Sequence, residues 1–240
     1  YRDYTRRSRD GDRKVEAFLR LGVVLDRAEQ HDEANAAYDE AVRLGKRNRR
    51  SLEAGLYYAA EARYRQGEAV IHEYEGIRIA GSMDGLRERL QRKSELLQRA
   101  AVIFADVVSF GVAEWVTASL YQIGRSYELF ARAMQEFEIP DGLSQEEQDS
   151  YRDQLAAFII PMEERALEAY DGGYRKALEL RIYNRWTAQL REALTRLNDV
   201  QYPPTREIGV ELERDLTLPL PQPLEGLERP AVAAPAEGEG

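Results

Sequence analysis

The chain has 240 residues, of which 43% are hydrophobic and 32% are charged, and this composition is typical of a water-soluble protein with a packed core. It contains no cysteine, which excludes disulfides, zinc ribbons, thiolate nucleophiles and iron–sulfur clusters. Only two histidines are present, so most histidine-based catalytic and metal sites are excluded as well. No apolar run is long enough to predict a membrane span.

The formal net charge of −9 is distributed unevenly along the chain. Residues 1–14 carry six basic and three acidic groups, whereas residues 205–240 carry eight acidic and three basic groups. The body between them is therefore acidic, and it has no basic stripe that could hold a phosphate backbone. We expect no nucleic-acid partner.

Proline divides the chain into a body and a tail. Seven of the nine prolines lie at or after Pro203, whereas the body from about 14 to 200 contains only Pro140 and Pro161. That body is rich in Ala, Leu, Glu and Arg, which favours helices throughout. The last ten residues are of low complexity. We predict an all-α fold with a Pro-rich, partly disordered C-terminal tail over residues 201–240.

A pattern of large and small residues begins at Phe18. Intervals of 3, 1, 3, 9, 4 and 3 separate Phe18, Leu21, Gly22, Leu25, Ala34, Tyr38 and Ala41. The small residues let two helices cross closely, and the large residues fill the groove beside the crossing. These intervals resemble the tetratricopeptide repeat (TPR), which implies a helical hairpin over residues 14–48 and a right-handed α-solenoid of such hairpins.

Parts of the same pattern occur elsewhere in the chain. Tyr4 lies 34 residues before Tyr38, so we interpret residues 1–13 as the end of a preceding repeat in a longer array. The first-helix intervals recur at Leu120, Ile123, Gly124 and Tyr127. The second-helix intervals recur at Ala100, Phe104 and Val107, and at Ala166, Tyr170 and Gly173. Residues 49–200 are therefore predicted to form extended TPR-like repeats with longer helices.

The region 49–80 favours one long helix rather than two. Its apolar stripe from Leu52 to Ile77 keeps its phase across Gly67, and no Pro, Asn or Asp marks a turn there. We predict one helix of about 30 residues, roughly 45 Å long.

Further helices are predicted over about 86–110 and 113–138, with a break at Gly111. Ser144 and Glu147 form a capping-box sequence that starts the next helix. Pro161 is predicted to end or kink that helix, a further helix covers about 162–182, and Asn184 caps a last one that stops near Asn198.

The second half of the chain contains several blocks with aromatic residues in a characteristic order. They are Glu114-Trp115, the segment Leu120–Phe130, the loop Ile139–Leu143, Tyr183–Trp186 and Tyr202–Pro204. Together they resemble the C-terminal part of large TPR proteins of myxobacteria and related deltaproteobacteria, including those of the adventurous gliding-motility machinery. The resemblance covers about residues 50–206. It implies an envelope-associated, periplasmic scaffold without enzymatic activity.

One group of residues has the types and spacing of a metal site. Glu68, His72 and Glu75 would share a helix face and could hold a divalent ion, although a solvated helix face explains them better. Gly172-Gly173 lacks the strand and the Lys-Ser or Lys-Thr of a phosphate loop, so we interpret it as a site of close helix packing or a bend. No Gly-x-Ser-x-Gly nucleophile elbow is present. We therefore predict no catalytic residue, no metal and no cofactor.

Aromatic and charged residues on the predicted first helices are the candidates for partner binding. The register of a TPR unit places six residues on the concave face: Leu19, Val23, Tyr57, Glu61, Tyr121 and Arg125. Tyr and Arg are favoured in binding hot spots. The alternative is that neighbouring helices cover these side chains. The segment Asp215–Leu224 alternates Leu with Pro or polar residues, and it either docks on a partner or lies across its own helices.

These observations predict a non-enzymatic scaffold that holds other proteins in a larger assembly of the cell envelope, such as that of gliding motility. The alternative is a cytoplasmic regulatory or adaptor TPR domain that binds a partner protein. An enzyme is supported only by Glu68, His72 and Glu75. A signal peptide or lipobox in the upstream sequence would distinguish a periplasmic from a cytoplasmic location.

Overall fold

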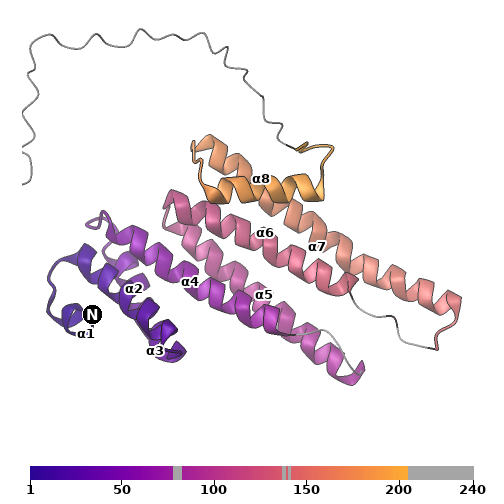
Figure 1. Ribbon diagram of the computed structural model, residues 1–240, viewed down its shortest axis with the longest axis horizontal. Helices are drawn as coiled ribbons and strands as arrows, with labels where there is room; N and C mark the ends of the chain where they lie inside the picture. The colour runs from indigo at the N-terminus through magenta and orange to yellow at the C-terminus, as the bar shows by residue number, and fades with distance from the viewer. Residues whose placement is uncertain (78–82, 137–138, 140–141, 205–240) are drawn as a thin grey trace, which may run out of the picture. The chain divides into compact units, whose positions relative to one another are not determined.

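Helices make up almost all of the part of the chain that the structure describes. The computed structural model describes residues 1–77, 83–136, Ile139 and 142–204, and within them no strand occurs (Figure 1). The helices are α1 (Arg2–Arg7), α2 (Gly11–Arg27), α3 (His31–Arg47), α4 (Gly55–Gly76), α5 (Met83–Ser109), α6 (Ala113–Gln135), α7 (Gln145–Glu179) and α8 (Arg185–Leu197). The predicted all-α class is confirmed. The tail predicted beyond Pro204, including Asp215–Leu224, lies outside the described residues.

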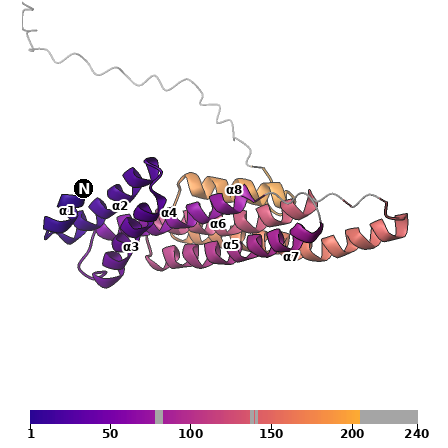
Figure 2. The same cartoon turned by 90° about the horizontal axis from the view of Figure 1, so that it is seen from below.

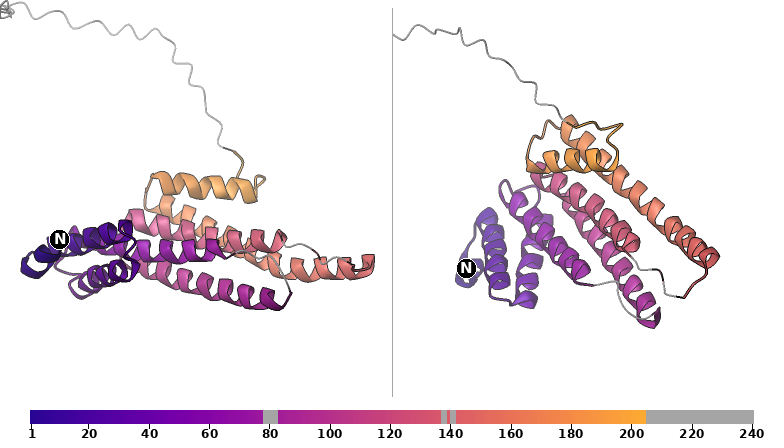
Figure 3. Two further views of the ribbon diagram at one scale, coloured as in Figure 1. Left: turned by 60° about the horizontal axis from the view of Figure 1, so that its bottom comes forward. Right: turned by 45° about the vertical axis from the view of Figure 1, so that its right-hand side comes forward.

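The helices pack in neighbouring pairs. Each of the helices α1 to α8 packs against the next one in the chain, and α2 also packs on α4, α4 on α6, and α6 on α8 (Figures 1 and 2). Figure 3 shows α8 lying over α6 and α7. The buried residues form one cluster centred on α2 to α6 and another on α7 and α8, and Tyr121 and Tyr127 pack against both. Helix α6 therefore connects the two clusters of buried residues.

Three helix pairs share one close contact, that of a glycine on the first helix with an aromatic ring on the second. A Cβ atom added at Gly22 would lie within 3.0 Å of the Tyr38 ring. The same is true of Gly67 and the Phe104 ring, and of Gly124 and the Tyr170 ring. A side chain at these glycines would displace the ring, so the glycine sets how closely the two helices approach. This contact links the pairs α2–α3, α4–α5 and α6–α7.

The side chain four residues after each glycine matches the type of ring. Asp26 follows Gly22, and its Oδ2 accepts a hydrogen bond of 2.7 Å from the Tyr38 hydroxyl. Glu128 follows Gly124 in the same way and accepts one of 2.8 Å from the Tyr170 hydroxyl. Ile71 follows Gly67 and is buried, as is Phe104, which has no hydroxyl to satisfy. The residue four positions after the glycine is therefore a carboxylate where the ring has a hydroxyl, and an apolar residue where it has none.

The repeat positions expected from the sequence lie in or beside the core. Gly22, Leu25, Ala34, Tyr38, Ala41 and Gly124 are buried, whereas Phe18, Leu21, Leu120 and Tyr127 are half-buried. The residues one helical turn before and after the ring in each pair are also buried, because they lie on the same face of the helix. They are Ala34 and Ala41, Ala100 and Val107, and Ala166 and Gly173.

Helix α4 is one continuous helix across Gly67, as its apolar stripe indicates. It has 22 residues rather than about 30, because residues 48–54 form turns before it begins. Asp12 stabilises this start, since its Oδ1 accepts hydrogen bonds from the backbone N–H groups of Glu53 (3.1 Å) and Gly55 (2.6 Å). A contact from α2 thus fixes where α4 begins.

The prediction of a separate helix beginning near residue 162 is wrong. Helix α7 runs without interruption through Pro161 for 35 residues. A proline removes one backbone hydrogen bond and crowds the preceding turn. The residues that pack on α6 and α8, which are Ala166, Tyr170, Gly173 and Ala177, all lie beyond that turn, so their packing is preserved.

The predicted helix starts at residues 144 and 184 are both confirmed. The Ser144 Oγ accepts from the Glu147 N–H at 3.3 Å, and a Glu147 carboxylate oxygen accepts from the Ser144 N–H at 2.8 Å. The Asn184 Oδ1 accepts from the N–H groups of Trp186 and Thr187, both at 3.0 Å. These caps satisfy backbone donors that a helix leaves free at its first turn.

We predict that Gly22→Ala and Gly124→Ala each lower the free energy of unfolding by about 1–3 kcal/mol, because the added methyl group collides with the facing tyrosine ring. The matched control is Gly172→Ala, since nothing lies within 4 Å of a Cβ at this position. The control is expected to be neutral or to stabilise α7 by about 0.5–1 kcal/mol. Urea unfolding measures all three. Equal stabilities for Gly124→Ala and Gly172→Ala would contradict the close contact.

Candidate partner-binding surface

The predicted concave-face residues on α2 and α4 are buried, partly buried or bonded to other residues of the chain. Leu19 is fully buried in the core and offers no surface to a partner, and Val23 is half-buried against the core. Tyr57 donates a hydrogen bond of 3.0 Å to Glu114 Oε2 on α6. Glu61 is 8% exposed and forms an ion pair with Arg65, one turn further along α4.

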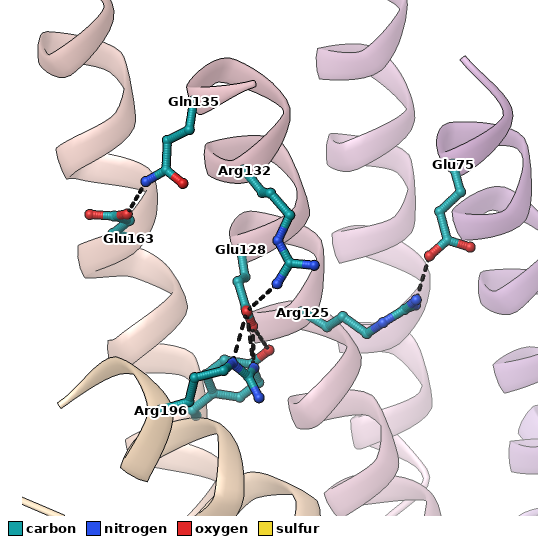
Figure 4. Close-up of polar contacts among 8 residues, drawn as sticks. Glu75, Arg125, Glu128, Arg132, Gln135, Glu163 and Arg196 are labelled. Atoms are coloured by element: carbon teal, nitrogen blue, oxygen red, sulfur yellow. Dashed lines mark hydrogen bonds and ion pairs between the residues drawn. The ribbon is translucent and has the colours of Figure 1, made fainter. Parts of the chain in front are cut away.

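The predicted residues on α6 also contact other helices. The Tyr121 ring lies 5.8 Å from the Tyr170 ring and 5.7 Å from the Trp186 ring, measured between centroids. Arg125 forms an ion pair with Glu75 of α4 (Figure 4). This placement agrees with the alternative in which neighbouring helices cover these side chains. Whether a partner displaces any of them stays a prediction.

A continuous series of ring contacts connects α4 with α6, α7 and α8. Consecutive centroids lie between 5.0 and 5.9 Å apart, in the order Tyr58, Tyr57, Trp115, Tyr64, Trp186, Tyr121 and Tyr170. Pairs at this distance in tilted or edge-on geometry contribute about 0.5–1.5 kcal/mol each beyond their buried area. We call these seven residues the aromatic series. Trp186 places α8 against both α4 and α6.

Glu128 is the centre of a polar cluster that joins α6, α7 and α8 (Figure 4). Its carboxylate accepts from Arg196 of α8 at 2.8 Å, from Arg132 at 3.1 Å and from the Tyr170 hydroxyl. The Glu128 side chain is only 13% exposed, so solvent screens these pairs less than it screens surface ion pairs. Burial, together with the Glu128 carboxylate, raises the pKa of Tyr170.

The proposed metal ligands do not come together. Glu75 faces Arg125, and no group of three or more metal-binding side chains lies together in the described ranges 1–77, 83–136 and 142–204. No helix in the described part of the chain is long and apolar enough to cross a membrane.

An open groove of about 790 Å³ lies between α3 and α5, with α4 as its floor. Its lining residues are Asn35, Asp39, Arg63, Gln66, Ala69, Val70, Glu73, Glu95, Gln98, Arg99, Val102 and Ile103. We call it the α3–α5 groove. Val102 of α5 lines the groove, and it is 67% exposed although it is apolar.

Charged side chains fix one end of the groove. Asp106 of α5 accepts from Lys46 of α3 at 2.7 Å and from Arg63 Nε of α4 at 2.9 Å, so three helices meet at one carboxylate. Gln66 then links Arg63 to Asp39, through bonds of 3.0 and 2.8 Å. This network holds α3 and α5 together at one end of the groove.

Sequence reasoning missed the α3–α5 groove, because its walls come from helices 60 residues apart. One signal was present in the sequence. Val102 is out of phase with the second-helix stripe of Ala100, Phe104 and Val107, and an apolar residue outside its stripe indicates an exposed apolar surface.

Comparison with known proteins adds no relative. No family model, curated protein or solved structure matches this chain.

We predict that the free energy of unfolding falls as the pH rises from about 10 to 12. Burial and the Glu114 carboxylate raise the pKa of Tyr57 to about 12, and burial also raises the pKa of Tyr170. The folded state therefore keeps protons that the unfolded chain has lost, so the stabilisation present below pH 10 disappears with rising pH. Urea unfolding at about pH 9 and about pH 11 measures the loss, which should be smaller in Tyr170→Phe. An identical loss in that variant would contradict the assignment.

Proposed function

We propose that this chain is a non-enzymatic protein–protein interaction scaffold built as a right-handed α-solenoid of TPR-like hairpins. The pairs α2–α3, α4–α5 and α6–α7 are its successive units, and α8 is the first helix of the next one. The shared glycine–ring contact supports this proposal, since it occurs at the same place in each pair. The packing of α2 on α4, α4 on α6 and α6 on α8 agrees with a stack in which first helices line one face.

The α3–α5 groove is the observation that carries the binding function. The aromatic series around Trp186 fills the predicted concave face, whereas the groove is open and is lined by charged, polar and apolar side chains. Ala69 and Val102 are exposed and can receive apolar side chains, while Asp39, Glu95 and Arg99 can pair with polar groups beside them. We therefore assign the groove to a helical or extended segment of a partner protein.

The resemblance to envelope TPR proteins favours a periplasmic or envelope-associated assembly, such as that of gliding motility, over a cytoplasmic adaptor. Fractionation of cells of the source organism, with detection of the chain in periplasmic, membrane and cytosolic fractions, tests this location. Recovery in the cytosol alone would favour the regulatory alternative.

We predict that a photo-crosslinking amino acid at position 102 captures a discrete partner band from a lysate of the source organism. The control is the same amino acid at Val24 of α2, which is 50% exposed and apolar but lies outside the groove. Excess chain without the photo-crosslinking amino acid should abolish the band captured at position 102, because it competes for the same partner. Equal labelling at both positions, or labelling that does not saturate, would show that the groove is not the binding surface.

A further inference from the structure

Four polar side chains are buried where α4, α6 and α8 meet, and each has a polar atom that no described residue bonds. They are Trp115, Ser119 and Gln122 of α6 and Trp186 of α8, and none is more than 7% exposed. The atoms in question are the two indole Nε1 atoms, the Ser119 Oγ and the Gln122 Oε1. We call these four side chains the Trp–Ser cluster.

The Trp–Ser cluster surrounds one residue of α4, Tyr64. The Trp115 ring lies 5.0 Å and the Trp186 ring 5.9 Å from the Tyr64 ring, measured between centroids. The Gln122 Nε2 donates a hydrogen bond of 3.0 Å to the Tyr64 hydroxyl. Ser119 lies one turn from both Trp115 and Gln122, so it shares their face of α6. The four side chains therefore occupy one region of the core.

The hydroxyl of Ser119 is not used within its own helix. Ser126, which is also buried in α6, donates to the backbone carbonyl of Gln122, one turn earlier, at 2.7 Å. Helical serines commonly make this bond, but the Ser119 Oγ makes none with the described residues. Its hydroxyl is therefore available to a group outside α6.

The other hairpins have alanine where α6 has Ser119. Ala17 of α2 and Ala62 of α4 lie at the equivalent position, five residues before the glycine of the close contact, and both are buried. A side chain the size of alanine thus fits this place in the fold. What serine adds at this position is a hydroxyl group.

Buried polar groups without a partner are costly, so the Trp–Ser cluster requires one. Each unpaired group lowers the ratio of folded to unfolded chain about fivefold or more. The indole N–H groups only donate, the Gln122 Oε1 only accepts, and a hydroxyl does both. A ligand that satisfies all of them must accept and donate. It must also be uncharged, because the four groups are neutral, and small enough to lie among packed rings.

We propose that the Trp–Ser cluster is a binding site for internal water. The water accepts from the indole N–H groups and donates to the Ser119 Oγ and the Gln122 Oε1. A buried water molecule makes about three hydrogen bonds, so about one or two molecules suffice. Since Trp186 belongs to α8 and the other three side chains to α6, the water joins these helices. The site lies apart from the α3–α5 groove, and its test does not depend on partner binding.

A high-resolution crystal structure of the whole chain tests the site directly. We expect an ordered solvent molecule within about 3.2 Å of at least two of the four atoms, one of them an indole Nε1. The proposal is overturned if the electron density shows no solvent there, or if both indole N–H groups donate to protein atoms instead.

Ser119→Ala tests the same site in solution, because a bonded hydroxyl and an unpaired one give effects of opposite sign. If water bonds this hydroxyl, the equilibrium constant for folding should fall about fivefold or more. If the hydroxyl is unpaired, alanine should raise the constant, since it removes a desolvated group and favours helix. Urea unfolding measures the change, and a gain in stability overturns the proposal.

The matched control is Ser150→Ala, which makes the same substitution at an exposed position of α7. It reports the helix propensity of alanine without burial, so it should leave the folding constant unchanged or raise it slightly. A loss of stability in Ser150→Ala equal to that in Ser119→Ala would also contradict the site, because the loss would then not depend on the Trp–Ser cluster.

Discussion

The packing of an aromatic ring against a glycine on the preceding helix is the contact on which the rest of the fold depends. At Gly22, Gly67 and Gly124 the absence of a side chain lets the second helix approach until its ring lies on the first helix. The approach brings the tyrosine hydroxyls within reach of a carboxylate one turn further on. The same distance buries the small residues on both sides of each ring. One local constraint thus determines packing and spacing in all three pairs, and it places a hydrogen-bond acceptor beside the ring in the two pairs that carry a tyrosine.

The second level of organisation joins the pairs to one another, and it has a consequence for binding. The aromatic series runs from Tyr58 to Tyr170. Within it, the Trp186 ring of α8 contacts both the Tyr64 ring of α4 and the Tyr121 ring of α6. The ion pair between Arg196 and Glu128 holds the other end of α8 against α6. Helices of the same chain therefore cover Tyr57 and Tyr121, two of the residues predicted to bind a partner. The α3–α5 groove, by contrast, is open.

Sequence reasoning predicts well what neighbouring residues decide. The caps at Ser144 and Asn184 and the continuous α4 follow from residues within one or two turns, and the close contacts at Gly22 and Gly124 follow from the spacing of the repeat. It fails where distant packing decides. Pro161 is tolerated because the packed face of α7 begins beyond it, which the sequence does not reveal. Leu19 has the register of an exposed position but lies in the core, and the groove around Val102 depends on helices that meet only in the fold.

The glycine and the ring act as one unit within each helix pair, and a double-mutant cycle measures this coupling. Gly22→Ala and Tyr38→Leu are combined, because the smaller leucine gives the added methyl group room. The account predicts a coupling free energy of about 1 kcal/mol or more, so that the double variant is more stable than the sum of the single changes indicates. The distant pair Gly22→Ala with Tyr170→Leu should be additive to within about 0.5 kcal/mol. Additivity in both pairs would contradict the account.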